Sequence, residues 1–234
     1  MCWSAGADLA AGVVVSGLGL ACLARVRRAG QLPLAALPLL LGVHQLIEAA
    51  VWLGADGRIG AGPAQWARTA WAVIALPLLP VLVPTGVLRA ARTPEGRRRR
   101  AALVASAAVG VAVAVPLMVA VARHPVTAEE HGHMLSYAVG IPYAPLLLAG
   151  YLVATIGSPL LSGDRTLRLL GVLTGVGALL SALLWRLAFA STWCALAALV
   201  SVVLLEWVRR DGRPAHPALS GRRAPGRAGR NGPR

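Results

Sequence analysis

Long apolar stretches alternate with short polar connections along almost the whole chain. The stretches cover residues 7–25, 32–53, 67–89, 101–122, 134–156, 167–187 and 190–207. A helix needs about 20 apolar residues to cross a bilayer core of about 30 Å, since it rises about 1.5 Å per residue. The pattern therefore predicts an all-α, polytopic membrane protein that forms a seven-transmembrane-helix bundle.

Composition supports this prediction. Hydrophobic residues make up 57% of the 234 residues, and the mean hydropathy is +0.67. A soluble domain could not bury seven such stretches, because the helices of a soluble bundle keep a polar face. The N-terminal segment carries no positive charge before the first apolar stretch, so we expect that stretch to remain as a span and not to be a signal peptide.

The cationic residues predict the orientation of the chain. All 23 are arginine, and nineteen of them fall in the first, third and fifth connections and in the C-terminal tail. The other side has only Arg58, Arg68, Arg123 and Arg186. The positive-inside rule then places the N-terminus outside and the C-terminus in the cytoplasm, in a multi-pass protein of the plasma membrane. A retinal cofactor is excluded, because the chain has no lysine to form a Schiff base.

Two regions are expected: a transmembrane domain at residues 1–208 and a tail at residues 209–234. The tail is rich in Arg, Pro and Gly and has no apolar periodicity, which is typical of disorder. Eight arginines beside the membrane predict contact with anionic lipid head groups. No nucleic-acid partner is expected, because no aromatic residues are interleaved with these arginines.

The second span carries the least usual polar residues. His44, Glu48 and Trp52 are spaced four residues apart and so share one helix face, and Gln45 lies beside them. Glu48 lies about five residues, or roughly 7 Å, from the outer end of the span. An ionisable group at that depth should face the bundle interior and have a partner.

Two interpretations of this face remain open. Arg68 and Arg186 lie at a similar outer depth, so one of them could form a structural ion pair with Glu48. Alternatively, His44, Gln45 and Glu48 form a proton, ion or substrate site.

Other candidate groups also map to the outer side. His131 and His133 are weak candidates for a Zn²⁺ or Cu²⁺ site, the alternative being a solvated loop. Cys2 and Cys194 lie at the same face and depth, where an oxidising environment favours a disulfide; two free thiols are the alternative. Most tryptophans map to the outer interface as an aromatic belt. The dense prolines of the third span, at positions 77, 80 and 84, predict a kink or local unwinding.

Several short motifs resemble those of an uncharacterised bacterial family of multi-helix membrane proteins whose members begin Met-Cys-Phe-Ser-Ala. The chain begins Met-Cys-Trp-Ser-Ala, and residues 38–48 are similar to the family's second-span motif. Residues 192–194 and 162–165 resemble two further motifs, the latter with an inserted glycine. The resemblance extends to about residue 207 and gives weight to Cys2, Gln45, Glu48 and Cys194. His44 replaces a usual Gln, so a mechanism common to the family would not rest on it. The resemblance implies no activity.

We therefore expect an integral membrane protein of non-enzymatic function, such as a small transporter, a sensor or a structural bundle. Its candidate site is an outer-leaflet polar pocket formed by Glu48, Gln45, His44, Arg68 and Arg186. The alternative is a metal-dependent membrane hydrolase that uses Glu48 with His44, His131 and His133. The sequence contains no phosphate-binding loop and no serine-nucleophile elbow.

Overall fold

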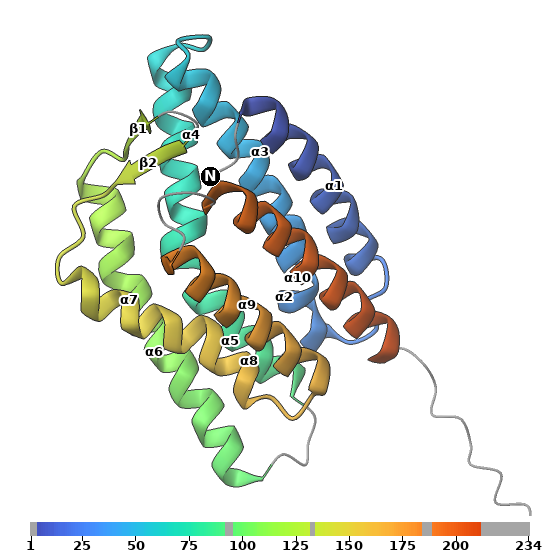
Figure 1. Cartoon of the computed structure of the whole chain (residues 1–234). Coiled ribbons are helices and arrows are strands. Elements are labelled where there is room, and N and C mark those ends of the chain that lie inside the picture. The colour runs from blue at the N-terminus through green and yellow to red at the C-terminus, as the bar shows by residue number, and fades with distance from the viewer. Residues whose placement is uncertain (1–3, 92–95, 132–133, 184–188, 212–234) are drawn as a thin grey trace, which may run out of the picture.

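A computed structural model describes residues 4–91, 96–131, 134–183 and 189–211, without the side chains of residues 130, 131, 134, 182, 189–195 and 211. The described chain is a helical bundle with one small hairpin (Figure 1). The elements are α1 (Ala5–Leu23), α2 (Leu32–Ala35), α3 (Leu37–Ala55), α4 (Ala61–Val73), α5 (Leu79–Ala90), α6 (Arg97–Arg123), β1 (Thr127–His131), β2 (Met134–Ala138), α7 (Ala144–Leu152), α8 (Ser158–Leu161), α9 (Arg165–Leu183) and α10 (Phe189–Asp211). Short helical segments η1 (Ala29–Gln31), η2 (Ile74–Leu78) and η3 (Val153–Gly157) join some of them.

Five helical stretches in the described chain are long and apolar enough to cross a membrane. They are Ala5–Leu23, Ala29–Ala55, Ala61–Ala90, Arg97–Arg123 and Ala144–Leu161. Many of their aliphatic side chains point outward, such as Val13 and Val14 of α1 and Val115 of α6. An exterior of this kind suits a hydrocarbon solvent better than water. These stretches agree with the first four predicted spans and with the second half of the fifth.

The first and second spans pack with their backbones in close contact, because glycines line the contact between α1 and α3. A Cβ at Gly19 would overlap the backbone of Leu39, and one at Gly42 would overlap the backbone of Ser16. Glycine is therefore required for α1 to lie this close to α3, as is common where membrane helices pack through small residues. Helix α10 lies beside both of them (Figure 1).

The fifth predicted span, 134–156, is wrong in its first half. Residues 134–138 form β2, which pairs antiparallel with β1, and the helix begins only at Ala144. Pro142 and Pro145 explain the late start, since the residue before a proline is held away from helical backbone angles and proline itself is favoured in a first helical turn. The strand β1 thus occupies residues 127–131 in the connection where a solvated loop was the alternative to a metal site.

Two π-helical segments interrupt the third and fifth spans in the same way. Each segment is followed by a proline, Pro80 after η2 and Pro159 after η3. Proline has no N–H, so it cannot donate a hydrogen bond to the carbonyl five residues earlier. Side-chain hydroxyls replace the missing donors: Tyr151 donates to the Ala75 carbonyl at 2.8 Å, and Ser158 donates to the Ala154 carbonyl at 2.6 Å. The prolines of the third span thus change its helical register, and the chain remains helical from Ala61 to Ala90.

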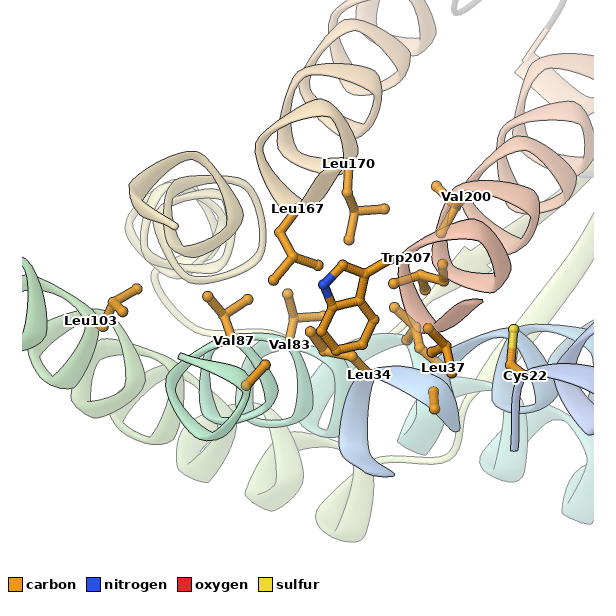
Figure 2. Packing of buried hydrophobic residues seen from close by; sticks show 14 residues of the cluster. Cys22, Leu34, Leu37, Val83, Val87, Leu103, Leu167, Leu170, Val200 and Trp207 are labelled. Carbon is orange, nitrogen blue, oxygen red and sulfur yellow. The ribbon is translucent and has the colours of Figure 1, made fainter. Parts of the chain in front are cut away.

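A large apolar cluster holds the helices together at one end of the bundle (Figure 2). It includes Leu34, Val87, Leu103, Leu167 and Trp207, which come from five different helices. The Trp207 indole N–H donates to Asp164 Oδ2 at 3.2 Å.

Asp164 belongs to one of the short motifs noted in the sequence, and it has two structural roles. While its Oδ2 accepts from Trp207, its Oδ1 accepts from the backbone N–H groups of Thr166 and Leu167 and so caps the start of α9. The motif therefore ties the start of α9 to the end of α10.

We predict that Gly19→Ala destabilises the bundle, because the new methyl group would force α1 away from the backbone of Leu39. We expect a loss of about 1–3 kcal/mol in the free energy of unfolding, the usual cost of overpacking. Gly17→Ala is the matched control, since a Cβ at Gly17 meets no atom within 4 Å. Thermal unfolding of both variants in detergent measures the difference, and equal shifts would contradict the assigned packing.

Candidate functional site

The polar face of α3 is buried, as its depth in the second span predicts. His44, Gln45, Glu48 and Trp52 are all buried, with Glu48 only 1% exposed. They are buried because α3 packs against α1, α4 and α10. The predicted site residues of this helix are therefore brought together in the interior of the bundle.

Asp8, which the sequence analysis did not assign to the site, is a second acidic residue at this place. It lies in the first turn of α1, where Ser4 caps the helix by accepting from the N–H of Ala7, and it is fully buried. The Asp8 and Glu48 carboxylates lie close enough for each charge to act on the other. One signal could have revealed Asp8: it is the first charged side chain of the chain and is followed by an apolar stretch.

The hairpin brings a tyrosine to the buried residues Asp8, His44, Gln45, Glu48 and Trp52, which we call the polar cluster. The Tyr137 hydroxyl, from β2, donates a hydrogen bond to Glu48 Oε1 at 3.5 Å. Its ring stacks on Trp71 of α4 with a centroid distance of 3.6 Å and an interplanar angle of 3°. Trp71 in turn lies 5.1 Å from the ring of His44, tilted by 35°. A column of three rings thus runs from the hairpin to α3.

Burial raises the pKa of Tyr137 far above its usual range, and the neighbouring Glu48 and Asp8 carboxylates raise it further. Arg68 lowers this pKa, but its effect is the smallest. The hydroxyl therefore keeps its proton at physiological pH. Tyr137 can act as a hydrogen-bond donor to Glu48 but not as a base.

Arg68 lies at the edge of the cluster, on α4. Its Nη2 donates to Gln65 Oε1 at 3.0 Å, and Gln65 Nε2 in turn donates to the carbonyl of Val126 just before β1 at 3.5 Å. Arg68 therefore helps to fix the hairpin to α4 and acts on Tyr137 through its charge. Arg186, the other predicted cation, lies outside the described residues.

Several buried polar atoms of this cluster make no hydrogen bond with any described residue. By hydrogen-bond geometry they are both carboxylate oxygens of Asp8, both side-chain polar atoms of Gln45, His44 Nε2, Arg68 Nε, and the indole nitrogens of Trp52 and Trp71. The indoles of Trp52 and Trp71 nevertheless lie close enough to the carboxylates of Asp8 and Glu48, respectively, to act on them. A buried polar group without a partner costs about 1–3 kcal/mol, so proteins rarely tolerate several together. Such a set is typical of a place that binds polar species.

A cavity of about 640 Å³ lies beside the cluster and shares His44 and Trp71 with it. It is lined by Leu41, His44, Trp71, Ile74, Ala75, Leu76, Leu79, Leu117, Ile141, Ala144, Pro145, Leu147, Leu148 and Tyr151. Glu48 is not among its lining residues. This cavity is thus mainly apolar, and the polar pocket predicted around Glu48 stays a prediction.

The predicted tryptophan belt is only partly right. Trp66 is 76% exposed, as an interfacial residue would be, but Trp52 and Trp71 are buried in the polar cluster. Trp3 and Trp185 lie outside the described residues, as does the side chain of Trp193.

The cysteine and metal predictions fall mainly on parts of the chain that the structure does not describe. Cys2, His133 and the side chains of His131 and Cys194 lie outside the described residues, so the disulfide and the histidine pair stay predictions. Cys22 is a free, buried thiol in the large apolar cluster. Among the described side chains, no three His, Cys, Asp or Glu residues lie close enough together to hold a metal ion.

A polar pocket of about 430 Å³ lies at the opposite end of α1. Its charged lining residues are Arg25 and Arg27, which follow α1, and Glu206, Arg209 and Arg210 of α10. Arg210 Nε donates to Glu206 Oε1 at 2.7 Å. Arginines of the first connection and of the last helix therefore line one pocket, although they are far apart in the sequence.

An apolar exterior, helices of membrane-spanning length and buried acidic groups define an integral membrane protein. Residues 1–219 match the family model DUF6629, described as a family of unknown function, and the chain belongs to this family. The expected membership of an uncharacterised family is thereby confirmed. No curated protein and no solved structure matches the chain.

We predict that Tyr137→Phe lowers stability by about 0.5–1.5 kcal/mol, since it removes the hydrogen bond to Glu48 but keeps the ring on Trp71. Tyr143→Phe is the control, because Tyr143 is 81% exposed and belongs to no described cluster. Thermal unfolding in detergent measures both variants. A Tyr137→Phe protein as stable as the control would show that the hydroxyl contributes nothing to the cluster.

Proposed function

We propose that this protein is a non-enzymatic, seven-span membrane protein, a small transporter or sensor, whose ligand site is the polar cluster around Glu48. The observation that carries the proposal is the set of buried polar atoms that make no hydrogen bond with described residues beside two buried carboxylates. A static structural bundle would gain nothing from such costly groups in its interior.

The charge of the cluster indicates what the site binds. Asp8 and Glu48 supply two carboxylates, and the charge of Arg68 at the edge acts on Tyr137, which donates to Glu48. Two carboxylates this close together disfavour each other's charged form unless a proton or a cation joins them. We therefore propose protons or small cations as the ligands of this site, with Gln45 and the indole N–H groups as neutral partners.

The metal-dependent hydrolase remains the alternative class, but no observation on the described residues favours it. The catalytic metal of such an enzyme needs three or more protein ligands. His44 is the only histidine of the predicted set whose side chain is described, and its neighbours are aromatic.

The proposal includes the predicted orientation, with the N-terminus outside and the C-terminus in the cytoplasm of a plasma-membrane protein. The arginine-lined pocket between the ends of α1 and α10 supports it, since basic residues of distant connections gather at one end. We propose that this pocket and the arginine-rich tail contact anionic lipid head groups of the inner leaflet.

Fluorescence titration tests the ligand site, because Trp52 and Trp71 lie within the cluster. We expect the emission of protein in lipid nanodiscs to change on titration with acid, or with sodium chloride against choline chloride. Glu48→Gln and Asp8→Asn should each abolish the change, because they remove the charge that binds the cation. Asp56→Asn, at an exposed acid after α3, should leave it intact. Identical titrations in all four proteins would refute the site.

Reporter fusions test the orientation. Alkaline phosphatase fused after Asp56 should be active, because that connection is expected outside, whereas fusion after Asp164 should be inactive. Green fluorescent protein at the same two positions should give the opposite result. A reversed pattern would overturn the orientation and, with it, the proposed contact of the basic pocket with inner-leaflet lipids.

A further inference from the structure

The apolar cavity of about 640 Å³ has a role that the polar cluster does not explain. Its walls come from α3, from α4 with η2, from α6, and from the first turns of α7. Pockets that bind small molecules usually measure about 300–1,000 Å³ and are mainly apolar with a few polar groups. Both the size and the lining of this cavity fall within that description.

An irregular helical segment forms part of the cavity wall. The π-helical turn η2 places Ile74, Ala75 and Leu76 along one wall, and π turns inside helices are frequent at functional sites. The Tyr151 hydroxyl donates a hydrogen bond to the Ala75 carbonyl, and both residues line the cavity. Leu41, Leu79 and Tyr151 also line a smaller apolar cavity of about 90 Å³ that continues inward.

One end of the cavity has an unused polar group. His44 lines the cavity and is 5% exposed, and its Nε2 makes no hydrogen bond with any described residue. The remaining walls are aliphatic, apart from the ring of Trp71 and the committed hydroxyl of Tyr151. Water is a poor occupant of such a space, since an apolar cavity of about 150 Å³ already stays dry and takes up apolar molecules.

The wall formed by α7 is open to the surroundings of the bundle. Leu148 is 58% exposed although it lines the cavity, and Ala144 and Pro145 are exposed as well. Their outward neighbour Leu146 is 72% exposed and does not line the cavity. A molecule in the surrounding hydrocarbon can therefore reach the cavity past the first turns of α7.

We propose that this cavity binds a single-chain amphiphile, a fatty acid or fatty alcohol, with its aliphatic chain in the cavity and its polar group at His44. A neutral imidazole nitrogen either donates or accepts, and a hydroxyl or protonated carboxyl group can match it in both cases. This site goes beyond the proposed function and does not depend on it: the two share His44 and Trp71, but neither Asp8 nor Glu48 lines the cavity.

Photolabelling of the full-length protein in nanodiscs tests the site. The probe is palmitic acid that carries a diazirine in its chain, with unlabelled palmitic acid and hexadecanol as competitors. We expect saturable labelling of residues 71–79 and 141–151 that both competitors displace. Labelling that increases without saturation, or that spreads evenly over α1, α6 and α9, would show lipid of the bilayer only and overturn the proposal.

Paired variants at the cavity wall sharpen the test. Leu147→Trp fills the cavity and should weaken labelling roughly tenfold, equivalent to about 1.4 kcal/mol of binding free energy. Leu146→Trp adds the same ring one residue away on the outer surface and should leave labelling unchanged. Equal labelling in the two variants would reject the cavity as the binding site.

Two further variants separate the amphiphile site from the proposed cation site at Glu48. They also keep the test valid if one variant fails to fold. His44→Phe keeps the ring but removes the nitrogen, and should weaken competition by about three- to tenfold, the effect of one hydrogen bond. Glu48→Gln should label like the unaltered protein, even where it abolishes the cation titration. If Glu48→Gln lost the labelling and Leu147→Trp did not, the amphiphile site would be rejected.

Discussion

The close packing of α1 on α3 is the constraint on which the rest of this structure depends. Glycines at positions 19 and 42 let the two backbones touch, since any larger residue would overlap the facing helix. Helix α1 is thereby held against α3, and the Asp8 carboxylate of its first turn comes close enough to act on Glu48. Two acidic residues separated by forty positions in the sequence become one buried group because two helices lack side chains where they meet.

Prolines have a second, complementary effect on the bundle. In the third and fifth spans, a proline removes a backbone donor and a π turn results, with a hydroxyl group satisfying the carbonyl that is left. The first of these turns contributes Ile74, Ala75 and Leu76 to the wall of the apolar cavity. Close packing therefore builds the polar side of the candidate region, and irregular helix builds its apolar side.

The sequence predicted the helical class and the approximate limits of most spans, because a long apolar stretch has few alternatives in a bilayer. It also predicted that His44, Gln45 and Glu48 are buried, since their spacing puts them on adjoining faces of one helix. The hairpin was missed because Met134, Leu135 and Tyr137 are as apolar as the helix that follows them. Only Pro142 and Pro145 indicated the boundary.

The partners of Glu48 could not be predicted in the same way, because they depend on how elements meet in three dimensions. Periodicity places residues on a face of their own helix, but it does not show which distant element covers that face. Tyr137 was expected inside a span and Asp8 was not assigned to the site, yet both lie at Glu48. The predicted pairing of Glu48 with Arg186 and the Cys2–Cys194 disulfide stay predictions.

The contact of Tyr137 with Glu48 also joins the surface of the protein to its interior. The hairpin lies at one end of the bundle (Figure 1), and its tyrosine is the group through which it contacts the buried carboxylate. A change in the charge of the carboxylates therefore changes the free energy needed to detach the hairpin. Because thermodynamic linkage is reciprocal, detaching the hairpin changes the free energy of charging the carboxylates by the same amount. A molecule that binds the hairpin at the surface would therefore change the protonation equilibrium of the buried carboxylates without contacting them.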